Sequence, residues 1–504
     1  MSFKNHQKQS YIIDTANAFT NRKISKRDFL RRMGMAGVGF SAFSAGMLGR
    51  PRRGFFGTPA AATTPEDMAN FLREAGKPYA GTTIRYTSEA TPPTVVANEL
   101  KGEFTELTGI NVEIEIVPLE QVLAKATQDV QGQLGTYDLY YLDQAWHATF
   151  YPDTVDPVEY YNEKPDLAMP DFDFDDFSTP LVEGISKIED KWVGIPFDIP
   201  IFTFMYRRDI LENHGIPVPK TYEEFTAAVE LITEAEKENG IYGTGLQAKS
   251  GHYSLECDWS QAVWGHGGSI FRADGTFSGN DEQGVMGLEW YQNLIANAPA
   301  ASLESTWDGQ FQMMQSGQVA MVQSWDEFFP GLDADDSKVQ GLWETTIPLM
   351  GPHSLRDRND AGFGEIPDWG HQGGSSIALS RYSKNIDASW LFLQWVCSKE
   401  TMVRLTLGGG FAPMRNSSFA DQRVLDKAVV GPGTTRHLPV VLETIENHIA
   451  SEPDMPLWAG LSSNEIPTEL GKLLTGQDYN GSAKACMDQV ASLVDTAVLD
   501  AGLR

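Results

Sequence analysis

Cysteine is scarce in this sequence, and the three that occur, Cys257, Cys397 and Cys486, lie far apart. An odd and widely spaced set excludes a scaffold built on disulfides, although an oxidising compartment would permit one disulfide. No C-x-x-C pair and no Cys/His spacing typical of a structural zinc site is present. We therefore expect no metal and no cofactor.

Basic residues are also few, at 39 Lys and Arg against 68 Asp and Glu, which gives a formal net charge of −29. Proteins that bind nucleic acid need basic surface to neutralise phosphates, so we expect no nucleic-acid partner. Hydrophobic residues make up 41% of the chain and charged residues 21%, which is enough for a packed core. The composition therefore indicates a folded and strongly acidic protein.

Long apolar runs and the common catalytic motifs are missing as well. No run after residue 62 is long enough to cross a bilayer. The sequence contains no G-x-G-x-x-G after a predicted strand, no G-K-[ST] loop, no H-E-x-x-H and no G-x-S-x-G. These absences exclude the commonest nucleotide-binding, metalloprotease and hydrolase sites, and we expect no catalytic residues. A glycosidase remains an open alternative, because it requires only two carboxyl groups about 5 to 10 Å apart.

The first 62 residues differ from the rest because they hold eleven Lys and Arg but only two acids. A basic segment, Ser25–Arg31 (SKRDFLR), precedes the uncharged stretch Met33–Gly49, and small residues follow up to Ala62. This order resembles a twin-arginine export signal, with Lys26 in place of the first arginine. The resemblance implies a signal peptide over residues 1–62, cleaved near Ala62, and a periplasmic mature protein. A disordered basic arm and an uncleaved anchor are the alternatives.

Beyond a predicted linker over residues 63–79, short strands alternate with helices. Strands are indicated where apolar and polar residues alternate, and helices where apolar residues recur every three or four positions. The predicted strands are Thr82–Thr87, Asn111–Val117 and Tyr137–Leu142, and the predicted helices are Val95–Leu107, one opened by a capping box at Thr221–Glu224, and one from Ile386. Trp395 lies on the apolar face of the last helix, so we expect it in the core. The alternation favours α/β layers, and the length favours two lobes.

Six groups of motifs follow one another along the chain. They are Lys191–Asp198 with Met205–Leu211, Pro217–Phe225, Trp264–Gly268, Phe311–Met321 with Trp325, Gly373–Leu379, and Gly410–Arg415. In sequence and order they resemble the solute-binding proteins of carbohydrate ABC importers, the maltose-binding-protein-like group of extracellular solute-binding family 1. Arg207 and Arg208 depart from the family pattern, in which Asn-Lys is usual. The resemblance extends over residues 82–495.

The resemblance implies the type II periplasmic-binding-protein fold, a two-lobed α/β fold with the ligand cleft between its lobes. Matching segments place lobe one at residues 80–197 and 349–411, and lobe two at residues 198–348 and 412–504. The implied function is capture of a neutral sugar or polyol by hinge closure and its delivery to the membrane permease subunits of an ABC importer. We expect a monomer. An exported carbohydrate-active enzyme and a component of a sugar-sensing receptor are the alternatives.

A sugar site is expected to combine carboxylates, which accept hydroxyl protons, with aromatic rings that cover the C–H faces of the sugar. Acids and aromatics that lie after predicted strands, or at positions that match the family motifs, supply the candidates. The candidate ligand-binding residues are Glu89, Asp143, Trp146, Asp198, Tyr253, Glu256, Trp264, Trp325 and Gly374.

For most of these candidates a purely structural role is the alternative. Asp143 would cap a helix, and Trp146 and Trp325 would only pack in the core. Asp198 would form a salt bridge at the hinge. Among the residues from Tyr253 to Trp264, one or two are expected to face the cleft. Gly374 would either present its backbone N–H to a ligand oxygen or form a turn that requires positive φ.

Overall fold

The structure is a computed structural model that describes residues 64–272, 274–351 and 369–504. Contacts within the chain separate residues Met1–Ala62 from the compact unit Thr63–Arg504, and the description below concerns the second unit. The predicted signal peptide lies outside the described residues. In the described part of the chain, no helix combines the length and the apolar character needed to cross a membrane.

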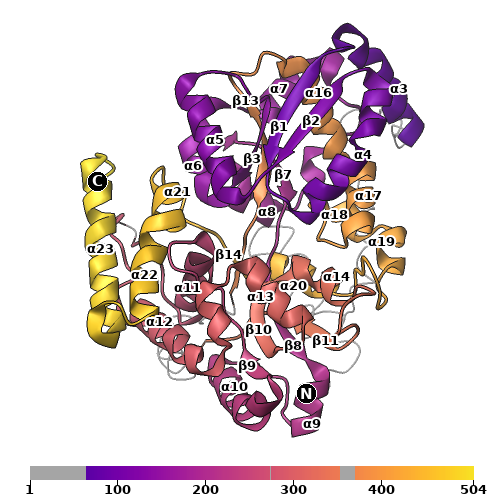
Figure 1. Cartoon of the computed structure of the whole chain (residues 1–504). Coiled ribbons are helices and arrows are strands. Elements are labelled where there is room, and N and C mark those ends of the chain that lie inside the picture. Colours follow the sequence, from indigo (N-terminus) through magenta and orange to yellow (C-terminus); the bar gives the residue numbers. More distant parts are fainter. Residues whose placement is uncertain (1–63, 273, 352–368) are drawn as a thin grey trace, which may run out of the picture. The chain divides into compact units, whose positions relative to one another are not determined.

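The first sheet has the strand order β2-β1-β3-β13-β4, and β7 also pairs with β13 (Figure 1). Its strands are β1 (Thr83–Ser88), β2 (Asn111–Ile116), β3 (Leu139–Asp143), β4 (Thr154–Val155), β7 (Ile195–Asp198) and β13 (Ser375–Ser380). β1 runs parallel to β2 and β3, whereas β13 runs antiparallel to β3, β4 and β7. The three strands predicted from the sequence are confirmed, to within two residues at each end.

The second sheet has the order β11-β8-β10-β9. Its strands are β8 (Phe202–Arg207), β9 (Tyr242–Thr244), β10 (Val319–Trp325) and β11 (Trp343–Thr346). β8 runs antiparallel to β10 and β11, and β9 runs parallel to β10. Two small two-stranded sheets complete the strands, β5 (Lys187–Ile188) with β6 (Lys191–Trp192), and β12 (Gly370–His371) with β14 (Ile449–Ala450).

Helices pack around both sheets (Figure 1). The helices close to the first sheet are α3 (Pro65–Gly76), α4 (Pro92–Thr108), α5 (Leu119–Gly132), α16 (Ile386–Val396) and α17 (Lys399–Gly409). Those close to the second are α9 (Arg208–His214), α10 (Tyr222–Glu236), α11 (Tyr253–Gly265), α12 (Glu282–Leu294), α13 (Trp307–Gln315) and α20 (Leu438–Asn447). The C-terminal helices α22 (Ile466–Leu474) and α23 (Ala483–Asp500) pack on α11 and α12.

Shorter helices fill the connections. They are α6 (His147–Phe150), α7 (Pro157–Glu163), α8 (Thr179–Ile185), α14 (Phe329–Leu332), α18 (Asn416–Phe419), α19 (Gln422–Asp426) and α21 (Trp458–Gly460).

The chain passes from the first sheet to the second between β7 and β8, through Ile199–Ile201. A returning segment lies beside this crossing, because Ile201 forms an antiparallel bridge with Gln372 and the Gly373 N–H donates to the Pro200 carbonyl at 2.9 Å. The Asp326 carboxylate, directly after β10, accepts a hydrogen bond from the Ile201 N–H at 2.6 Å. The crossing therefore holds the ends of β7 and β10 and the segment before β13 close together.

The predicted helices are confirmed, with two differences in detail. α4 starts at Pro92, earlier than predicted, because proline is tolerated in the first turn of a helix. The predicted capping box of α10 is only half formed. The Thr221 hydroxyl accepts a hydrogen bond from the Glu224 N–H at 3.2 Å, but the Glu224 carboxylate accepts one from the Lys220 N–H at 2.7 Å instead of the Thr221 N–H.

Helix α16 is buried on all sides and not on one face as its spacing predicted. Trp395 is in the core as expected, with its ring 5.6 Å from that of Phe104. On the other side of the helix, the Trp390 indole N–H and the Gln394 amide both donate to the Leu167 carbonyl. The segment around Leu167 therefore covers the face of α16 that the sequence would leave to solvent.

The predicted linker over residues 63–79 is wrong, because most of it is helix α3. Thr64 and Asp67 form a reciprocal capping box at its start, which satisfies two backbone N–H groups. Leu72 and Gly76 are buried, and a Cβ on Gly76 would meet the Thr108 Cα of α4 at 2.8 Å. The polar composition that suggested a linker belongs to the exposed face of an amphipathic helix.

Candidate functional site

A cavity of about 640 Å³ opens among segments that follow strands of both sheets. This volume is in the range of small-molecule sites. The first sheet supplies the loops after β1 and β2 and the ends of β3 and β7, and the second supplies the end of β10 and the turn into α14. The starts of α11 and α13 and the segment before β13 complete the lining.

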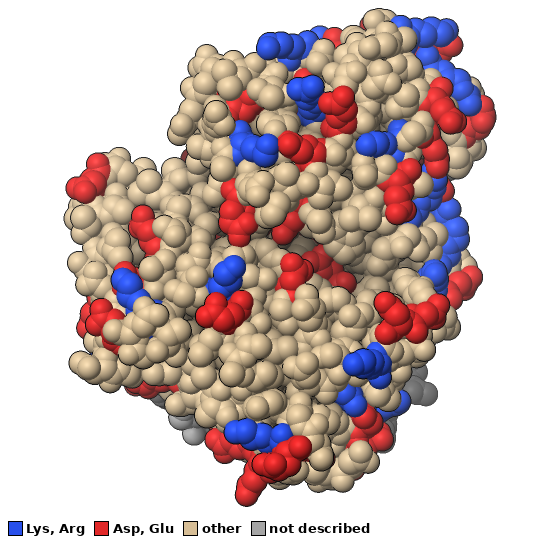
Figure 2. All heavy atoms as spheres, viewed as in Figure 1, with Lys and Arg blue, Asp and Glu red and all other residues tan. Residues whose placement is uncertain are grey.

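The cavity is acidic, and none of the described residues that line it is Lys or Arg. The acids of the lining are Glu89, Glu120, Asp143, Asp198, Asp308 and Glu327. Figure 2 shows Asp and Glu side chains gathered around a recess near the middle of this face. Of these acids, Glu120 has an imidazole partner within reach, His252, whose Nε2 lies 2.8 Å from its Oε1. The remaining acids meet in the cavity without Lys or Arg to balance them.

Asp198 lies at the end of β7, and its side chain is only 1% exposed. Burial raises the pKa of its carboxyl to about 7, against hydrogen bonds from Thr91 and Tyr141 that favour the ionised form. The Tyr141 hydroxyl donates to Asp198 Oδ2 at 3.4 Å. Burial, together with the charge of Asp198, also raises the pKa values of Glu89 and Glu327 well above their ordinary values. These three carboxyls therefore hold protons readily unless a cation or hydrogen-bond donors enter the cavity.

Asp143 is the last residue of β3 and caps the short helical turn that follows. Its Oδ1 accepts hydrogen bonds from the Ala145 N–H at 2.9 Å and from the Tyr253 hydroxyl at 3.3 Å. Burial, together with the nearby Glu452, raises the pKa of its carboxyl to about 8, against the hydrogen bond from the Ala145 N–H, which lowers it. The capping role and exposure to the cavity coexist, because only one of the two carboxylate oxygens is used in the cap.

Aromatic rings supply much of the remaining wall. They are Tyr141, Tyr253, Trp307, Phe311, Trp325 and Phe328. Trp325, at the end of β10, is held at its edge by Phe202, with ring centroids 4.1 Å apart at an angle of 63°. Phe311 and Phe328 stack on each other at 5.0 Å. Flat apolar faces next to carboxylates are the surface that the C–H faces and hydroxyl groups of a polyhydroxylated ligand require.

Gly374 forms a turn that only glycine fits. Its φ is +95°, and a Cβ there would meet the Asp198 carbonyl oxygen at 2.1 Å. Gly374 lies at the wall of the cavity, in direct contact with the backbone of Asp198. The positive φ that the turn interpretation requires is therefore present, and the presentation of the Gly374 N–H to a ligand stays a prediction.

The structure brings most of the predicted residues together at the cavity. Those that line it are Glu89, Asp143, Asp198, Tyr253, Trp325 and Gly374. The structure shows that these residues line the cavity, and their contact with a ligand stays a prediction.

Three predicted residues do not line the cavity, and for these the structure gives no support to ligand contact. Trp146 is buried in the turn after Asp143, in its alternative role as a core residue. Trp264 packs against His371, with ring centroids 5.2 Å apart. Glu256 lies on α11 between Tyr253 and Cys257, which line the cavity as an i, i+4 pair. Glu256 is fully buried and does not itself line the cavity.

Several lining residues were missed. Glu327 and Phe328 lie two and three residues after Trp325, so the motif position of Trp325 was a usable signal for them. Trp307 and Asp308 begin α13, directly before the motif that starts at Phe311 in the same helix. That motif was a usable signal, but their place at the cavity depends on how α13 packs against the second sheet.

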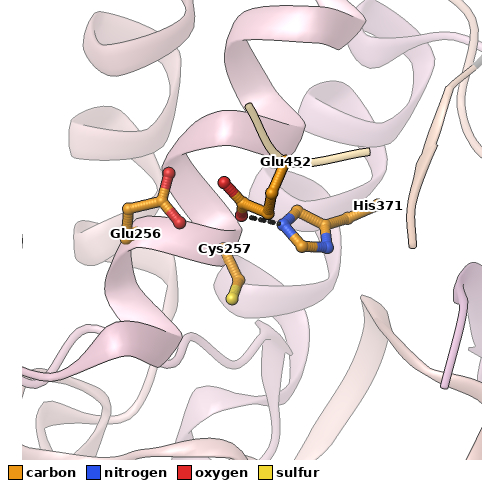
Figure 3. A group of neighbouring side chains, drawn as sticks. All are labelled: Glu256, Cys257, His371 and Glu452. Carbon is orange, nitrogen blue, oxygen red and sulfur yellow. Dashed lines mark hydrogen bonds and ion pairs between the residues drawn. The ribbon is translucent and has the colours of Figure 1, made fainter. Parts of the chain in front are cut away.

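A second polar group lies beside the cavity, made of Glu256, Cys257, His371 and Glu452 (Figure 3). All four side chains are buried, and one donor atom from each lies within 4.8 Å of the others. His371 Nε2 is 2.7 Å from Glu452 Oε1, and the Trp458 indole N–H donates to Glu452 Oε2. Cys257 also lines the cavity, so the two polar regions adjoin.

Known proteins resemble this chain over most of its length. The "Probable amino-acid ABC transporter periplasmic-binding protein y4oP" of Sinorhizobium fredii is 24% identical over 82% of this chain and 88% of its own. The "Erythritol/L-threitol-binding protein" of Mycolicibacterium smegmatis is 24% identical over 79% of this chain and 83% of its own.

Among solved structures, an ABC transporter solute-binding protein from Agrobacterium radiobacter K84 in complex with ribitol superposes with a TM-score of 0.72 at 24% identity. The match covers 83% of this chain and 99% of that protein. This likeness confirms the two-lobed α/β fold of solute-binding proteins that the sequence motifs implied. The model of the bacterial extracellular solute-binding protein family matches residues 88–403, which is more than half of the chain, and the chain therefore belongs to that family.

Proposed function

We propose that this protein captures a sugar or polyol in the acidic, aromatic cavity and delivers it to an ABC importer. The observation that carries the proposal is the combination of carboxylates and aromatic rings in one cavity among segments of both sheets. Each ionised carboxylate accepts two hydroxyl protons in charge-assisted hydrogen bonds. The rings of Trp307 and Trp325 offer flat apolar surface for the C–H faces of the ligand.

The ligands of the relatives support a small polyhydroxylated compound. The Agrobacterium structure contains ribitol, and the Mycolicibacterium relative is named for erythritol and threitol. These are neutral polyols, and Asp143 and Asp198 would accept hydrogen bonds from their hydroxyl groups. Relatives at this level of identity act as binding proteins and not as enzymes, which favours capture over hydrolysis of the ligand.

Hinge closure is the proposed mechanism of capture. The segment Ile199–Ile201 and its antiparallel neighbour at Gln372–Gly373 are crossings between the two sheets, and they run side by side. Two adjacent crossings can bend together, so the sheets, each with its own helices, would close as rigid bodies around the ligand. The lobe boundaries expected above, at residues 197/198, 348/349 and 411/412, stay proposals, and this arrangement favours placing the first two after Asp198 and at Gln372–Gly373.

The test of ligand capture is a thermal-shift screen against erythritol, ribitol, mannitol, and mono- and disaccharides. A ligand at 100 times its dissociation constant stabilises the fold by about 2.7 kcal/mol, which gives a clear increase in melting temperature. Asp198→Asn should abolish the shift, whereas the exposed Asp488→Asn should retain it. Recovery of the ligand intact after incubation would separate binding from hydrolysis. No shift with any member of the panel would refute the proposed ligand class.

Membership in an extracellular family implies an exported protein, and the proposed route is twin-arginine export to the periplasm. There the protein would meet the permease subunits as a monomer. The proposed signal contains Lys26 and Arg27. We expect the double substitution Lys26→Gln and Arg27→Gln to leave the precursor in the cytoplasm, as measured by cell fractionation. Mature periplasmic protein at the normal level would refute this route.

A ligand that carries an amine is the second candidate, favoured by the absence of Lys and Arg from the described lining. Glu89, Asp198 and Glu327 lie near one another with raised pKa values, so an ammonium group would relieve their repulsion. Matched pairs test this candidate, namely glucose against glucosamine and sorbitol against 1-amino-1-deoxysorbitol. The second candidate requires the aminated member to act at a concentration at least about tenfold lower, which corresponds to 1.4 kcal/mol. Stabilisation by the neutral members alone would reject it and support the first.

A further inference from the structure

The group formed by Glu256, Cys257, His371 and Glu452 combines four metal-binding side chains in one buried place. Glu256 and Cys257 come from one turn of α11, His371 from β12, and Glu452 from the segment after β14. Figure 3 shows the two carboxylates and the imidazole turned toward a common centre, with the Cys257 thiol beside them. These segments meet only in the folded chain, which is why no metal-site spacing was visible in the sequence.

The buried carboxylate of Glu256 is the main evidence that this group binds a further species. Its side chain is fully buried, and no donor among the described residues lies within hydrogen-bond distance of either carboxylate oxygen. Its carboxyl lies beside that of Glu452, so the two can satisfy each other only by sharing a proton. An unpartnered buried carboxylate is costly, because it has left water without gaining a hydrogen bond or a counter-charge.

The charge of the neighbourhood is also unbalanced. Asp143 lies within reach of the same group through the Tyr253 hydroxyl, which contacts both Asp143 and Glu452. No ion pair between described residues joins Glu256, Glu452 or Asp143 to a Lys or Arg, and His371 is the one basic partner, at Glu452. Two or three buried acids therefore face a single imidazole, and a divalent cation would neutralise the carboxylates of Glu256 and Glu452.

We propose that Glu256, Cys257, His371 and Glu452 form a binding site for a divalent transition metal, with Zn²⁺ as the best fit. One sulfur, one nitrogen and two oxygen donors suit a tetrahedral borderline cation and not Ca²⁺ or Mg²⁺, which require mostly oxygen ligands. Tetrahedral Zn²⁺ with bonds of about 2.0 to 2.3 Å places its ligands about 3.3 to 3.8 Å apart. The present spread of up to 4.8 Å therefore has to close by about 1.5 Å at most.

The surroundings of the group fit a metal site. The Trp458 indole N–H and the Tyr253 hydroxyl donate to the Glu452 carboxylate, and such outer contacts orient metal ligands. The His371 ring is enclosed by the rings of Trp264, Trp325 and Phe202, which exclude water. Cys257 lines the cavity, so the cavity provides an entry path for the ion. The thiol of Cys257 would release its proton when the metal binds.

The experiment uses the purified protein, stripped with a chelator and then titrated with Zn²⁺ alone and with Co²⁺ alone. We expect one Zn²⁺ per chain by elemental analysis after dialysis, and an increase in melting temperature on adding Zn²⁺. The Co²⁺ form should show a thiolate-to-cobalt absorption band in the near ultraviolet and visible bands typical of tetrahedral cobalt. Cys257→Ser should abolish the thiolate band and weaken Zn²⁺ binding by at least about tenfold.

The chain offers a matched control and a second variant. Cys397 is equally buried but lies outside the group, so Cys397→Ser should retain the Co²⁺ band and the Zn²⁺ affinity. Glu256→Gln preserves shape and tests the site if Cys257→Ser fails to fold, because it should also weaken Zn²⁺ binding by at least about tenfold. A protein that binds neither ion, or one whose Co²⁺ spectrum is unchanged by Cys257→Ser, would overturn the proposal. In that outcome Glu256 and Glu452 share a proton instead of a metal.

Discussion

Trp325 shows how one side chain can serve both the core and the cavity. Its ring packs against Phe202 and His371, with only 5% of the residue exposed, yet it lines the cavity. The packing fixes the ring in one orientation before any ligand arrives. An aromatic face held in this way contributes to binding without losing side-chain entropy on binding.

The first prediction concerns Trp325→Ala. Loss of a buried aromatic contact commonly costs about 2 kcal/mol or more, so binding should weaken roughly thirtyfold. Calorimetry with the ligand identified by the screen measures this, normalised to the folded fraction. Trp395→Ala is the control, because Trp395 is in the core far from the cavity lining. That variant should lower the melting temperature and bind normally per folded molecule. If Trp325→Ala behaves like the control, Trp325 does not contact the ligand.

The second prediction concerns His147, which is buried and forms a hydrogen bond through Nε2 with the Leu142 carbonyl at 3.0 Å. Burial lowers the pKa of its imidazole from 6.5 to about 4. The unfolded chain therefore binds the proton first, and stability is lost as the pH falls from about 6.5 to about 4.

Between pH 7 and pH 5 this residue alone should remove about 2 kcal/mol from the free energy of unfolding. His147→Gln keeps a side-chain N–H donor for the Leu142 carbonyl but does not titrate. Urea unfolding at pH 7 and pH 5 measures the free energy of unfolding of both proteins. The decrease between the two pH values should be smaller in the variant by about 2 kcal/mol. Equal losses in the two proteins would show that His147 is protonated in the fold.

At the residue scale, the sequence was informative where a candidate directly follows a strand. Asp143, Asp198 and Trp325 each end a strand and line the cavity, as their positions suggested. The sequence was uninformative along α11, whose residues are all buried. Hydrophobic patterning assigns a face only when one side of a helix is exposed, so nothing distinguished Tyr253 from Glu256.

At the scale of elements, the turn before β13 determines how closely β7 and β13 approach each other. Gly374 has φ of +95°, and its Cα lies so close to Asp198 that a Cβ would meet the Asp198 carbonyl oxygen at 2.1 Å. β13 pairs with β7 directly beyond this turn, with Ser375 opposite Asp198. Any shift of the turn therefore moves the backbone that carries the Asp198 carboxyl.

The third prediction follows from this contact. Gly374→Ala should destabilise the fold by about 1 to 3 kcal/mol, as overpacking and an unfavourable φ do, and should weaken ligand binding as well. Gly102→Ala is the control, since Gly102 lies within α4 and a Cβ there would meet no neighbouring group within 4 Å. It should stabilise the fold by about 0.5 to 1 kcal/mol, without any effect on binding. Thermal unfolding and calorimetry measure both variants, and normal binding by Gly374→Ala would contradict the coupling.

Element prediction succeeded for β1, β2 and β3 of the first sheet and failed for α3. The alternation of Val112, Ile114 and Glu113 marks β2 clearly, because its two faces differ in polarity. In α3, by contrast, the polar and proline-containing sequence favoured a linker. Proline in the first turn and acids near the N-terminus are nevertheless typical of a helix start. The burial of Leu72 against α4 decides between the two, and it depends on tertiary packing.

At the scale of the whole molecule, the two sheets exchange segments that are far apart in the sequence. β13 joins β3 and β7 in the first sheet after the chain has completed the second. No local pattern predicts this return, and the sequence indicated it only through the order of the family motifs. The same return brings Gly374 to the cavity and His371 to the Glu256 group.

The fourth prediction concerns hinge closure. A ligand that contacts groups on both sheets, such as Asp198 on β7 and Trp325 on β10, binds the closed state more tightly than the open one. It can shift the equilibrium only by that difference in affinity, so closure should depend on both contacts. We expect the radius of gyration from solution scattering to decrease when the ligand from the thermal-shift screen saturates the protein. Asp198→Asn, at ligand concentrations that still saturate the variant, should show a smaller decrease in the radius of gyration. The reason is that the ligand contacts the first sheet less strongly in this variant. An unchanged radius in the saturated wild-type protein would reject the hinge mechanism and leave ligand binding itself intact.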